Sequence, residues 1–443
     1  MSFKWVPFTD LLSTIVDNRG RTCPVGDTGI PLIATNCIDS TSLYPRYDTT
    51  RFVSDETYRR WFRGHPMPGD ILFVCKGSPG RTNWVPDPVD FCIAQDMVSV
   101  RADPKKIYPK YLFAALRSSV VQTQIDNMHV GTMIPHFKKG DFGKLNIPLL
   151  SRTAQHAIGD FYFTLSERIT LLRETNATLE AIAQALFKSW FVDFDPVRAK
   201  QEGRAPEGMS DATAALFPDG FEESELGLVP KGWRVLPVGE VVNVTDYVAN
   251  GSFAALKENV TLLAEPSYAL YVRTTDFNSG FSGEFRYVDK SAYDFLAKSS
   301  LDGNEVIISN VGDVGTVFRP PRWLGLPMTL GSNAVALKKP EMVAFLYFHF
   351  SGPQGQHDIQ SIVTGSAQLK FNKTNFRALR ILLPDSKCLA AFEAVANTLW
   401  SRVENNLAQA QTLATLRDTL LPRLISGQLR LPEAEALIEE ATA

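Results

Sequence analysis

The segment "IGDFYFTLSERITLLRETNATLEAIAQALFKSW" (residues 158–190) decides the fold, because apolar side chains recur in it at alternating intervals of three and four. This spacing predicts a helix with one apolar stripe, as at the a and d positions of a coiled coil. The stripe consists of Ile158, Tyr162, Leu165, Ile169, Leu172, Asn176, Leu179, Ala183, Leu186 and Trp190. Such a helix of roughly 37 residues would be about 55 Å long, too long to lie on one small domain. It therefore needs a partner helix.

A second segment, shifted by 234 residues, has the same pattern and supplies the partner. Its stripe is Phe392, Ala396, Leu399, Val403, Asn406, Ala410, Leu413, Arg417, Leu420 and Leu424. In an antiparallel pair Asn176 faces Asn406. In a parallel pair each asparagine faces an apolar residue, and each unpaired buried amide would cost about 1 to 3 kcal/mol of stability. We therefore predict an antiparallel coiled coil. Its weak layer sets Leu165 against Arg417, which is tolerable if the arginine head reaches water.

The two halves of the chain resemble each other outside these helices as well. "FVSDETYRRWFRGHPMPGDILFVCKGSPG" (52–80) matches "YVDKSAYDFLAKSSLDGNEVIISNVGDVG" (287–315), and "GTMIPHFKKGDFGKLNIPLL" (131–150) matches "GSAQLKFNKTNFRALRILLP" (365–384). Short apolar runs closed by glycine predict strands at 70–77 and 305–312, and 107–125 and 342–359 look like matching short helices. Each half thus begins with a mixed α/β module.

These patterns predict an α+β protein with two mixed α/β domains separated by two long helices and related by a pseudo-twofold repeat. The expected parts are a first domain (1–150), a central helix (151–197), a connector (198–232), a second domain (233–384), and a C-terminal helix and tail (385–443). The connector is rich in Gly, Pro and acidic residues, which favours an extended segment that still packs through Leu216, Phe217 and Phe221.

Composition points to an ordinary globular protein: the 443 residues are 44% hydrophobic and 21% charged. The five cysteines and six histidines show neither a disulfide framework nor metal-ligand spacing, so no metal is expected. The start lacks the apolar core of a signal peptide, and no run is long enough to span a membrane. We expect a soluble protein in a reducing cytoplasm.

The net charge of -3 conceals an alternating pattern. Residues 1–150 hold 18 Lys and Arg against 14 Asp and Glu, while residues 151–232 hold 8 against 13. The next stretch, 233–384, holds 14 against 13, and residues 385–443 hold 5 against 8. The pattern fits two modules that meet a polyanion and two helical segments that meet protein, and it fits random variation of surface charge equally well.

The chain resembles the specificity subunits of type I restriction-modification systems, which have two target-recognition domains separated by two helices. The resemblance covers the whole chain and rests most on "ALFKSWFVDFDPV" (185–197), "LFPDGFEESELGLVPKGW" (216–233) and "LRDTLLPRLISGQLR" (416–430). The ends of the two modules fit more loosely, and "ILLP" stands where "IPLP" is more usual.

The resemblance implies a DNA-reading scaffold without catalysis or a bound cofactor of its own. It implies two methyltransferase partner subunits that form an adenine-N6 methylase using S-adenosylmethionine. In complexes that also restrict DNA, it implies two motor-nuclease subunits that use ATP and Mg²⁺. Antiparallel helices would place the modules as in a dimer made from one chain, so that each reads one half of an asymmetric two-part duplex site.

The helix ending at "AIAQALFKSWFVDFDPV" (181–197) carries more aromatic surface than one partner helix covers. One hypothesis is that Phe187, Trp190, Phe191 and Phe194 bind a methyltransferase subunit. The alternative is that these side chains pack on their own module or on the connector. Pro196 is expected to end the helix, because it has no amide hydrogen and disfavours helix at Asp195.

Candidate DNA contacts are polar and basic residues on the loops of each module, since base edges need donors and acceptors and phosphates attract cations. The first module offers Lys76, Ser78, Arg81, Thr82 and Asn83 on one loop and Thr132, His136, Lys138 and Lys139 on another. The second module offers Asn310, Arg319, Arg322, Gln368, Lys370, Asn372 and Lys373. Trp84 and Trp323 belong either to these loops or to the core.

Two other functions compete with DNA recognition. A methyltransferase acting alone would need a [DNS]-P-P-[YFW] tetrapeptide and a Gly-rich cofactor loop, and an autonomous motor would need a P-loop; the sequence contains none of these. A coiled-coil spacer whose modules bind proteins remains as the alternative.

Overall fold

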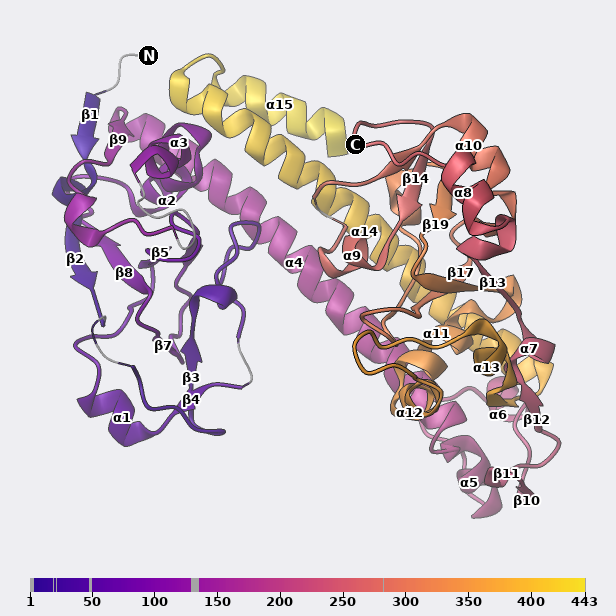
Figure 1. The fold of residues 1–443 in the computed structure, drawn as a ribbon. Coiled ribbons are helices and arrows are strands. Elements are labelled where there is room, and N and C mark those ends of the chain that lie inside the picture. The colour runs from indigo at the N-terminus through magenta and orange to yellow at the C-terminus, as the bar shows by residue number, and fades with distance from the viewer. Residues whose placement is uncertain are drawn as a thin grey trace. The chain divides into compact units, whose positions relative to one another are not determined.

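The structure is a computed structural model that describes residues 4–18, 20, 22–47, 50–128, 135–281 and 283–442. The chain divides into two compact units, Met1–Glu174 with Gln409–Ala443, and Thr175–Ala408. Each unit contains one α/β module and part of both long helices, α4 (Arg152–Phe191) and α14 (Ser386–Ser426) (Figure 1). The predicted α+β class with two long helices is confirmed.

In its described residues, the first module has two small sheets besides the two-stranded sheet that closes it. The antiparallel four-stranded sheet has the order β2-β8-β5-β6, formed by β2 (Leu12–Val16), β8 (Met97–Ala102), β5 (Ile71–Val74) and β6 (Thr82–Trp84). The second sheet has β3 (Ile30–Ile33) at its centre, antiparallel to β4 (Phe52–Val53) and parallel to β7 (Cys92–Ile93). All four residues of β5 are buried, so the apolar run predicted there is an interior strand.

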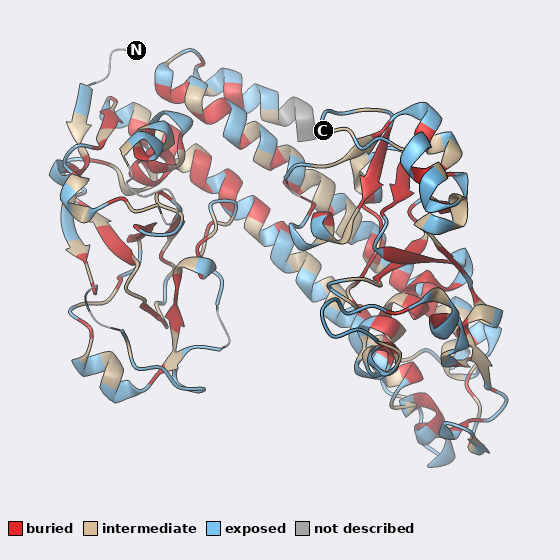
Figure 2. Ribbon diagram, in the orientation of Figure 1, coloured by how far each residue is buried: buried red, intermediate tan, exposed pale blue. Residues whose placement is uncertain are grey.

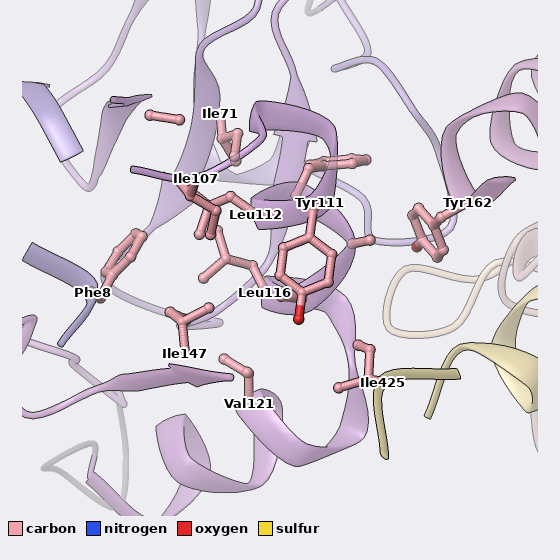
Figure 3. Close-up of a cluster of buried hydrophobic side chains, with 14 of the residues drawn as sticks. Phe8, Ile71, Ile107, Tyr111, Leu112, Leu116, Val121, Ile147, Tyr162 and Ile425 are labelled. Carbon is pink, nitrogen blue, oxygen red and sulfur yellow. The ribbon is translucent and has the colours of Figure 1, made fainter. Parts of the chain in front are cut away.

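Helices α1 (Asp55–Arg60), α2 (Pro109–Arg117) and α3 (Ser119–Met128) complete the first module. The short helix predicted over 107–125 is thus two helices, because Ser118 has an extended backbone with ψ 146°. Residues 111–116 of α2 are all buried. They belong to a core that includes Phe8, Ile71, Ile147, Tyr162 and Ile425, and Figure 3 shows Tyr111, Leu112 and Leu116 of α2 within it. The long helices therefore contribute to the core of this module.

The second module repeats this plan with longer helical insertions. Its sheets have the orders β13-β20-β17-β18 and β15-β14-β19-β16. The strands are β13 (Asn243–Asp246), β20 (Ala334–Lys338), β17 (Glu305–Ser309), β18 (Val317–Phe318), β15 (Tyr287–Val288), β14 (Ala269–Val272), β19 (Met328–Leu330) and β16 (Ser300–Leu301). The helices are α7 (Val238–Val241), α8 (Phe253–Asn259), α9 (Thr274–Asn278), α10 (Lys290–Phe295), α11 (Val343–Ser351), α12 (Pro353–Ser361) and α13 (Lys373–Ala378). Strands β14, β17 and β19 are buried (Figure 2).

The strand registers show that the two modules are equivalent. Val74 pairs with Met97 in the first module, and Ser309 pairs with Ala334 in the second. The parallel pair of β3 and β7 corresponds to the parallel pair of β14 and β19. The internal repeat seen in the sequence is therefore a structural repeat.

A two-stranded antiparallel sheet closes each module. In the first, β1 (Lys4–Pro7) pairs with β9 (Asn146–Leu149), and Lys4 lies opposite Leu149. In the second, β12 (Arg234–Pro237) pairs with β21 (Arg380–Leu383), and Arg234 lies opposite Leu383. The start and the end of each module thus meet, and a long helix follows directly.

Helices α4 and α14 pack antiparallel within each unit. In the first unit, Ile158 shares a core with Leu424, and Ile169 shares one with Leu413. In the second unit, Ala183 and Trp190 share a core with Ala396 and Phe392. Contacts move backward along α14 as they move forward along α4, which confirms the predicted direction.

The two polar layers of this coiled coil behave differently from each other. The Asn406 side-chain amide donates to the Asn176 side-chain oxygen at 2.8 Å, as the antiparallel pairing predicted. The expectation that the Arg417 head reaches water is wrong, because this residue is only 3% exposed. Its guanidinium donates to Asp418 at 2.8 Å and to the Ser166 hydroxyl at 3.3 Å, which satisfies the buried charge.

The connector is more structured than predicted. It contains α5 (Asp195–Gln201), α6 (Asp211–Ala214) and a hairpin of β10 (Phe221–Ser224) and β11 (Gly227–Pro230). Phe217 is buried in the second unit, and Leu216 and Phe221 pack against the same core. Pro196 does not end α4, which stops at Phe191; Pro196 lies in the first turn of α5, where its missing amide hydrogen costs nothing.

A C-terminal helix, α15 (Leu431–Thr442), follows α14. Within the ranges that the structure describes, no helix is both long enough and apolar enough to cross a membrane.

Candidate nucleic-acid interface

In the first module, the two loops predicted to touch DNA meet at the end of β5. The Phe137 amide donates to the Cys75 carbonyl at 2.8 Å, and the Gly77 amide donates to the Pro135 carbonyl at 2.9 Å. Between these bonds Lys76 and His136 form an isolated antiparallel bridge. Gly77 has a φ of 90°, a conformation that glycine adopts without strain. Candidate residues 60 positions apart in sequence are thus neighbours.

The same junction occurs in the second module. The Phe371 amide donates to the Asn310 carbonyl at 3.1 Å, and the Gly312 amide donates to the Leu369 carbonyl at 3.0 Å. Val311 and Lys370 form the isolated bridge that corresponds to Lys76 and His136. The same pair of loops therefore forms the candidate surface in both modules.

A third segment, just before β8 or β20, joins these loops. The Asp96 carbonyl accepts from the amides of Cys75 at 2.9 Å and Lys76 at 3.2 Å. In the second module the Asn333 carbonyl accepts from the Asn310 amide at 3.0 Å. Since Cys75 and Asn310 are equivalent, Asp96 and Asn333 occupy the same position of the repeat.

Each junction borders a concave surface. The first hollow has a volume of about 560 Å³ and is lined by Asp17, Gly20, Thr22, Cys75, Lys76, Gln95, Asp96 and His136. The second hollow has a volume of about 430 Å³, and its lining includes Arg273, Asn278, Ser309, Val311, Gly312, Ser332 and Asn333. Both hollows are lined by the segment that follows β5 or β17 and by the segment that precedes β8 or β20. The rest of each lining comes from different parts of the modules, and the side chains differ.

An ion pair lies at the same place in each module. Lys139 Nζ is 3.3 Å from the Asp17 carboxylate, and Lys373 Nζ is 3.0 Å from the Asp246 carboxylate. All four side chains are partly buried or half-buried. These two lysines, both candidate DNA contacts, are already partly neutralised by their carboxylate partners.

The other candidates differ in exposure. Lys76, Arg81, Lys138, Arg322, Gln368, Lys370 and Asn372 are exposed, and Ser78, His136 and Asn310 are half-buried. The Asn372 side chain accepts from the Asn375 amide at 2.7 Å, so its oxygen caps α13. Thr132 lies outside the described residues.

The prediction for Thr82 and Asn83 is wrong, because both residues are fully buried in β6. The Asn83 side chain accepts from the Asp39 amide at 3.0 Å and donates to the Ser42 carbonyl at 2.8 Å. The Thr82 hydroxyl accepts from Arg117 at 3.2 Å. These groups hold the loop that follows Cys37 against the sheet, and they face away from solvent.

The prediction for Arg319 is also wrong. Its guanidinium donates to Glu404 of α14 at 2.9 Å and lies 3.9 Å from the ring centre of Trp400. Burial lowers the pKa of Arg319, and the Glu404 carboxylate opposes that shift. Arg319 therefore fixes the second module to α14 within its own unit, which is a structural role.

The hypothesis that Phe187, Trp190, Phe191 and Phe194 form a free partner-binding face is wrong for the first three residues, which are 5%, 7% and 7% exposed. Phe191 packs edge-on against Phe345 and Phe392, with ring centres 5.2 and 5.1 Å apart. Phe194 is half-buried against Phe221 and Trp233. The alternative holds: this unit covers its own aromatic cluster.

Asp17, Gln95 and Asp96 of the first hollow, and Ser332 and Asn333 of the second, were not predicted from the sequence. The segments "IAQDMV" (93–98) and "LGSNAV" (330–335) contain a pair of polar residues between buried strands in both modules. That shared position in the repeat was the signal available for finding them.

Comparison with known proteins agrees with this architecture. The family described as "Type I restriction modification DNA specificity domain" matches residues 63–181. The match and the fold support a subunit of the specificity type, with two modules of the target-recognition kind.

Two relatives are named as specificity subunits of type I restriction enzymes. The type I restriction enzyme HindI specificity subunit of Haemophilus influenzae is 23% identical over 82% of this chain and 86% of its own length. The MjaIX specificity subunit of Methanocaldococcus jannaschii is 23% identical over 77% of this chain and 75% of its own length. A solved S subunit from M. genitalium is 16% identical with a TM-score of 0.55 over 96% of both chains, which shows a shared fold. The sequence matches support a DNA-recognition subunit of a type I restriction-modification system.

Proposed function

We propose that this chain reads an asymmetric two-part duplex site, with one module for each half. The observation that carries the proposal is the repeated junction of three segments, which borders a hollow in each module, and the two hollows are lined by different side chains. Two equivalent surfaces with unlike polar groups suit two unlike half-sites, because bases are distinguished by the donors and acceptors that meet them.

Exposed cations around the hollows supply attraction to the phosphate backbone. Lys76 lines the first hollow, and Arg81 and Lys138 lie on the adjoining loops. Lys370 pairs with Val311, which lines the second hollow. Such contacts fix the position of a protein on DNA without reading its sequence. Polar side chains inside the hollows are then left to contact base edges.

The chemistry belongs to partner subunits in this proposal. Two methyltransferase subunits bind the chain and transfer a methyl group from S-adenosylmethionine to adenine N6. Where restriction occurs, two motor-nuclease subunits that use ATP and Mg²⁺ join the complex. The similarity to type I specificity subunits supports these assignments, which purification of the chain with its co-expressed partners and determination of the subunit ratio would test.

The decisive experiment is selection from a random duplex library by the chain in complex with its methyltransferase partner. The expected result is enrichment of a two-part sequence with a fixed gap. Binding that depends on salt but shows no sequence preference would contradict the proposal, and absence of DNA binding would favour a spacer whose modules bind proteins. The variant Lys76→Ala with Lys370→Ala should weaken binding to all duplexes alike.

A further inference from the structure

Asp96 and Asn333 occupy one structural position in the two modules but carry different chemistry. Each precedes the central strand of its four-stranded sheet, and each carbonyl accepts the amide hydrogen of the equivalent residue, Cys75 or Asn310. The backbone therefore holds both residues in place, while the side chains remain available.

Both side chains line the hollows, and the described residues offer neither of them a hydrogen-bond or ionic partner. Asp96 is half-buried in the first hollow, and Asn333 is exposed at the second. Neither side chain makes a hydrogen bond or an ion pair with any residue in the described part of the chain. Among the described residues, neither Asp96 nor Asn333 therefore holds a neighbouring loop through its side chain as Asn83 does.

The two side chains present complementary patterns to base edges. A carboxylate only accepts hydrogen bonds and would repel a nearby phosphate, so its presence on a DNA-facing surface needs a donor such as the N4 amino group of cytosine. A carboxamide both donates and accepts, which matches the N6 and N7 edge of adenine.

We propose that Asp96 and Asn333 are specificity-determining residues. Asp96 accepts a hydrogen bond from a cytosine amino group in the half-site of the first module. Asn333 makes the paired contact with adenine in the half-site of the second module. This inference rests on the proposed function and assigns one base position in each half-site to one equivalent position of the protein.

The test uses the complete chain co-expressed with its methyltransferase partner in a host without other adenine methylation, followed by mapping of methylated sites across the genome. Asp96→Asn should change or relax one position in one half of the motif, with discrimination shifted by about 5- to 150-fold. Asn333→Asp should do the same in the other half alone. Asp126→Asn, the same change at an exposed residue of α3 outside both hollows, is the matched control and should leave the motif unchanged.

Motifs that stay unchanged in both variants, or that change in the same half for both, would overturn the inference while the two-part motif of the parent chain upholds the proposed function. If the parent chain itself gives no two-part motif, the proposed function fails. If a variant abolishes methylation, its base preference is measured instead by the binding of the purified complex to duplexes that differ at one base. A uniform loss across all duplexes would also overturn the inference.

Discussion

The side-chain amide of Asn406 donates a 2.8 Å hydrogen bond to the side-chain oxygen of Asn176. Asn406 is 4% exposed, so its amide has little access to water if this partner is removed. The pair makes the layer compatible with only one alignment of α4 and α14.

Replacing one asparagine of this pair should therefore cost stability. Asn176→Leu leaves the Asn406 amide without its partner and should lower the free energy of unfolding by about 1 to 3 kcal/mol. The double variant with Asn406→Leu should recover most of the loss, because both polar groups are gone. Urea-unfolding midpoints of the two variants measure this, and a double variant less stable than the single variant would contradict the pairing.

Arg417 offers a second test of the coiled coil. Its guanidinium lies 5.3 Å from the ring centre of Tyr162, while its ionic partner Asp418 is 61% exposed and loses little when the charge is removed. Arg417→Leu should be neutral or stabilising by about 1 kcal/mol, because burying a charge is costly. Arg417→Ala leaves a cavity and should destabilise by about 2 kcal/mol or more. Thermal unfolding of both variants measures which is the more stable, and a leucine variant as unstable as the alanine variant would contradict this prediction.

The aromatic end of α4 should behave as core. Phe191→Ala should lower the free energy of unfolding by about 3 to 5 kcal/mol. Val192→Ala, at the adjacent position that is 51% exposed, should change it by less than about 0.5 kcal/mol. Urea unfolding separates the two. Unchanged stability of the Phe191 variant together with lost subunit assembly would restore the docking hypothesis.

Lys370 and Arg319 should separate DNA contact from structural support. Lys370→Ala should weaken binding to every duplex and reduce the slope of log K against log salt by about 1. Arg319→Gln should leave that slope unchanged and lower the melting temperature, since it breaks the contacts with Glu404 and Trp400. Binding titrations at several salt concentrations, with melting curves alongside, distinguish the roles. Equal slope changes in both variants with equal melting temperatures would refute the assignment.

His349 should make the second unit sensitive to acid. Burial lowers the pKa of His349 from 6.5 to about 4. His349 therefore takes up a proton near pH 6.5 in the unfolded chain but only near pH 4 in the folded chain. The free energy of unfolding is therefore unaffected by this group above pH 6.5. It falls as the pH drops from 6.5 toward 4, by about 3 kcal/mol in total. His349→Phe should flatten stability measured across this range, whereas His357→Phe, at an exposed position of α12, should not.

Much of the fold followed from periodicity. The spacing of Ile158 to Trp190 and its copy 234 residues later predicted both long helices, and the two asparagines predicted their direction. These predictions succeeded because a buried stripe and a buried amide each have few ways to be satisfied. Arg417 was misjudged, since a nearby Ser166 hydroxyl satisfies a buried arginine and the sequence does not show that contact.

The candidate site was harder to predict, because loop chemistry does not show which way a side chain points. Asn83 and Lys76 lie on the same polar stretch, yet Asn83 bonds the backbone around Asp39 while Lys76 stays exposed. The aromatic cluster was misread for a related reason. Its cover comes from α11, whose "VAFLYFHF" (343–350) is apolar around most of its surface and therefore needs neighbours on several sides.

The sheets that close the modules, β1 with β9 and β12 with β21, bear on how the gene could exchange segments. Because Lys4 lies opposite Leu149 and Arg234 opposite Leu383, each module leaves and rejoins the chain at a single point beside the start of a long helix. A gene segment bounded by those points encodes one module, whose core is completed by side chains of α4 and α14. An exchange of that segment between related genes would replace one module as a unit while α4 and α14 keep their sequence, and the incoming module would have to fit the same helix side chains.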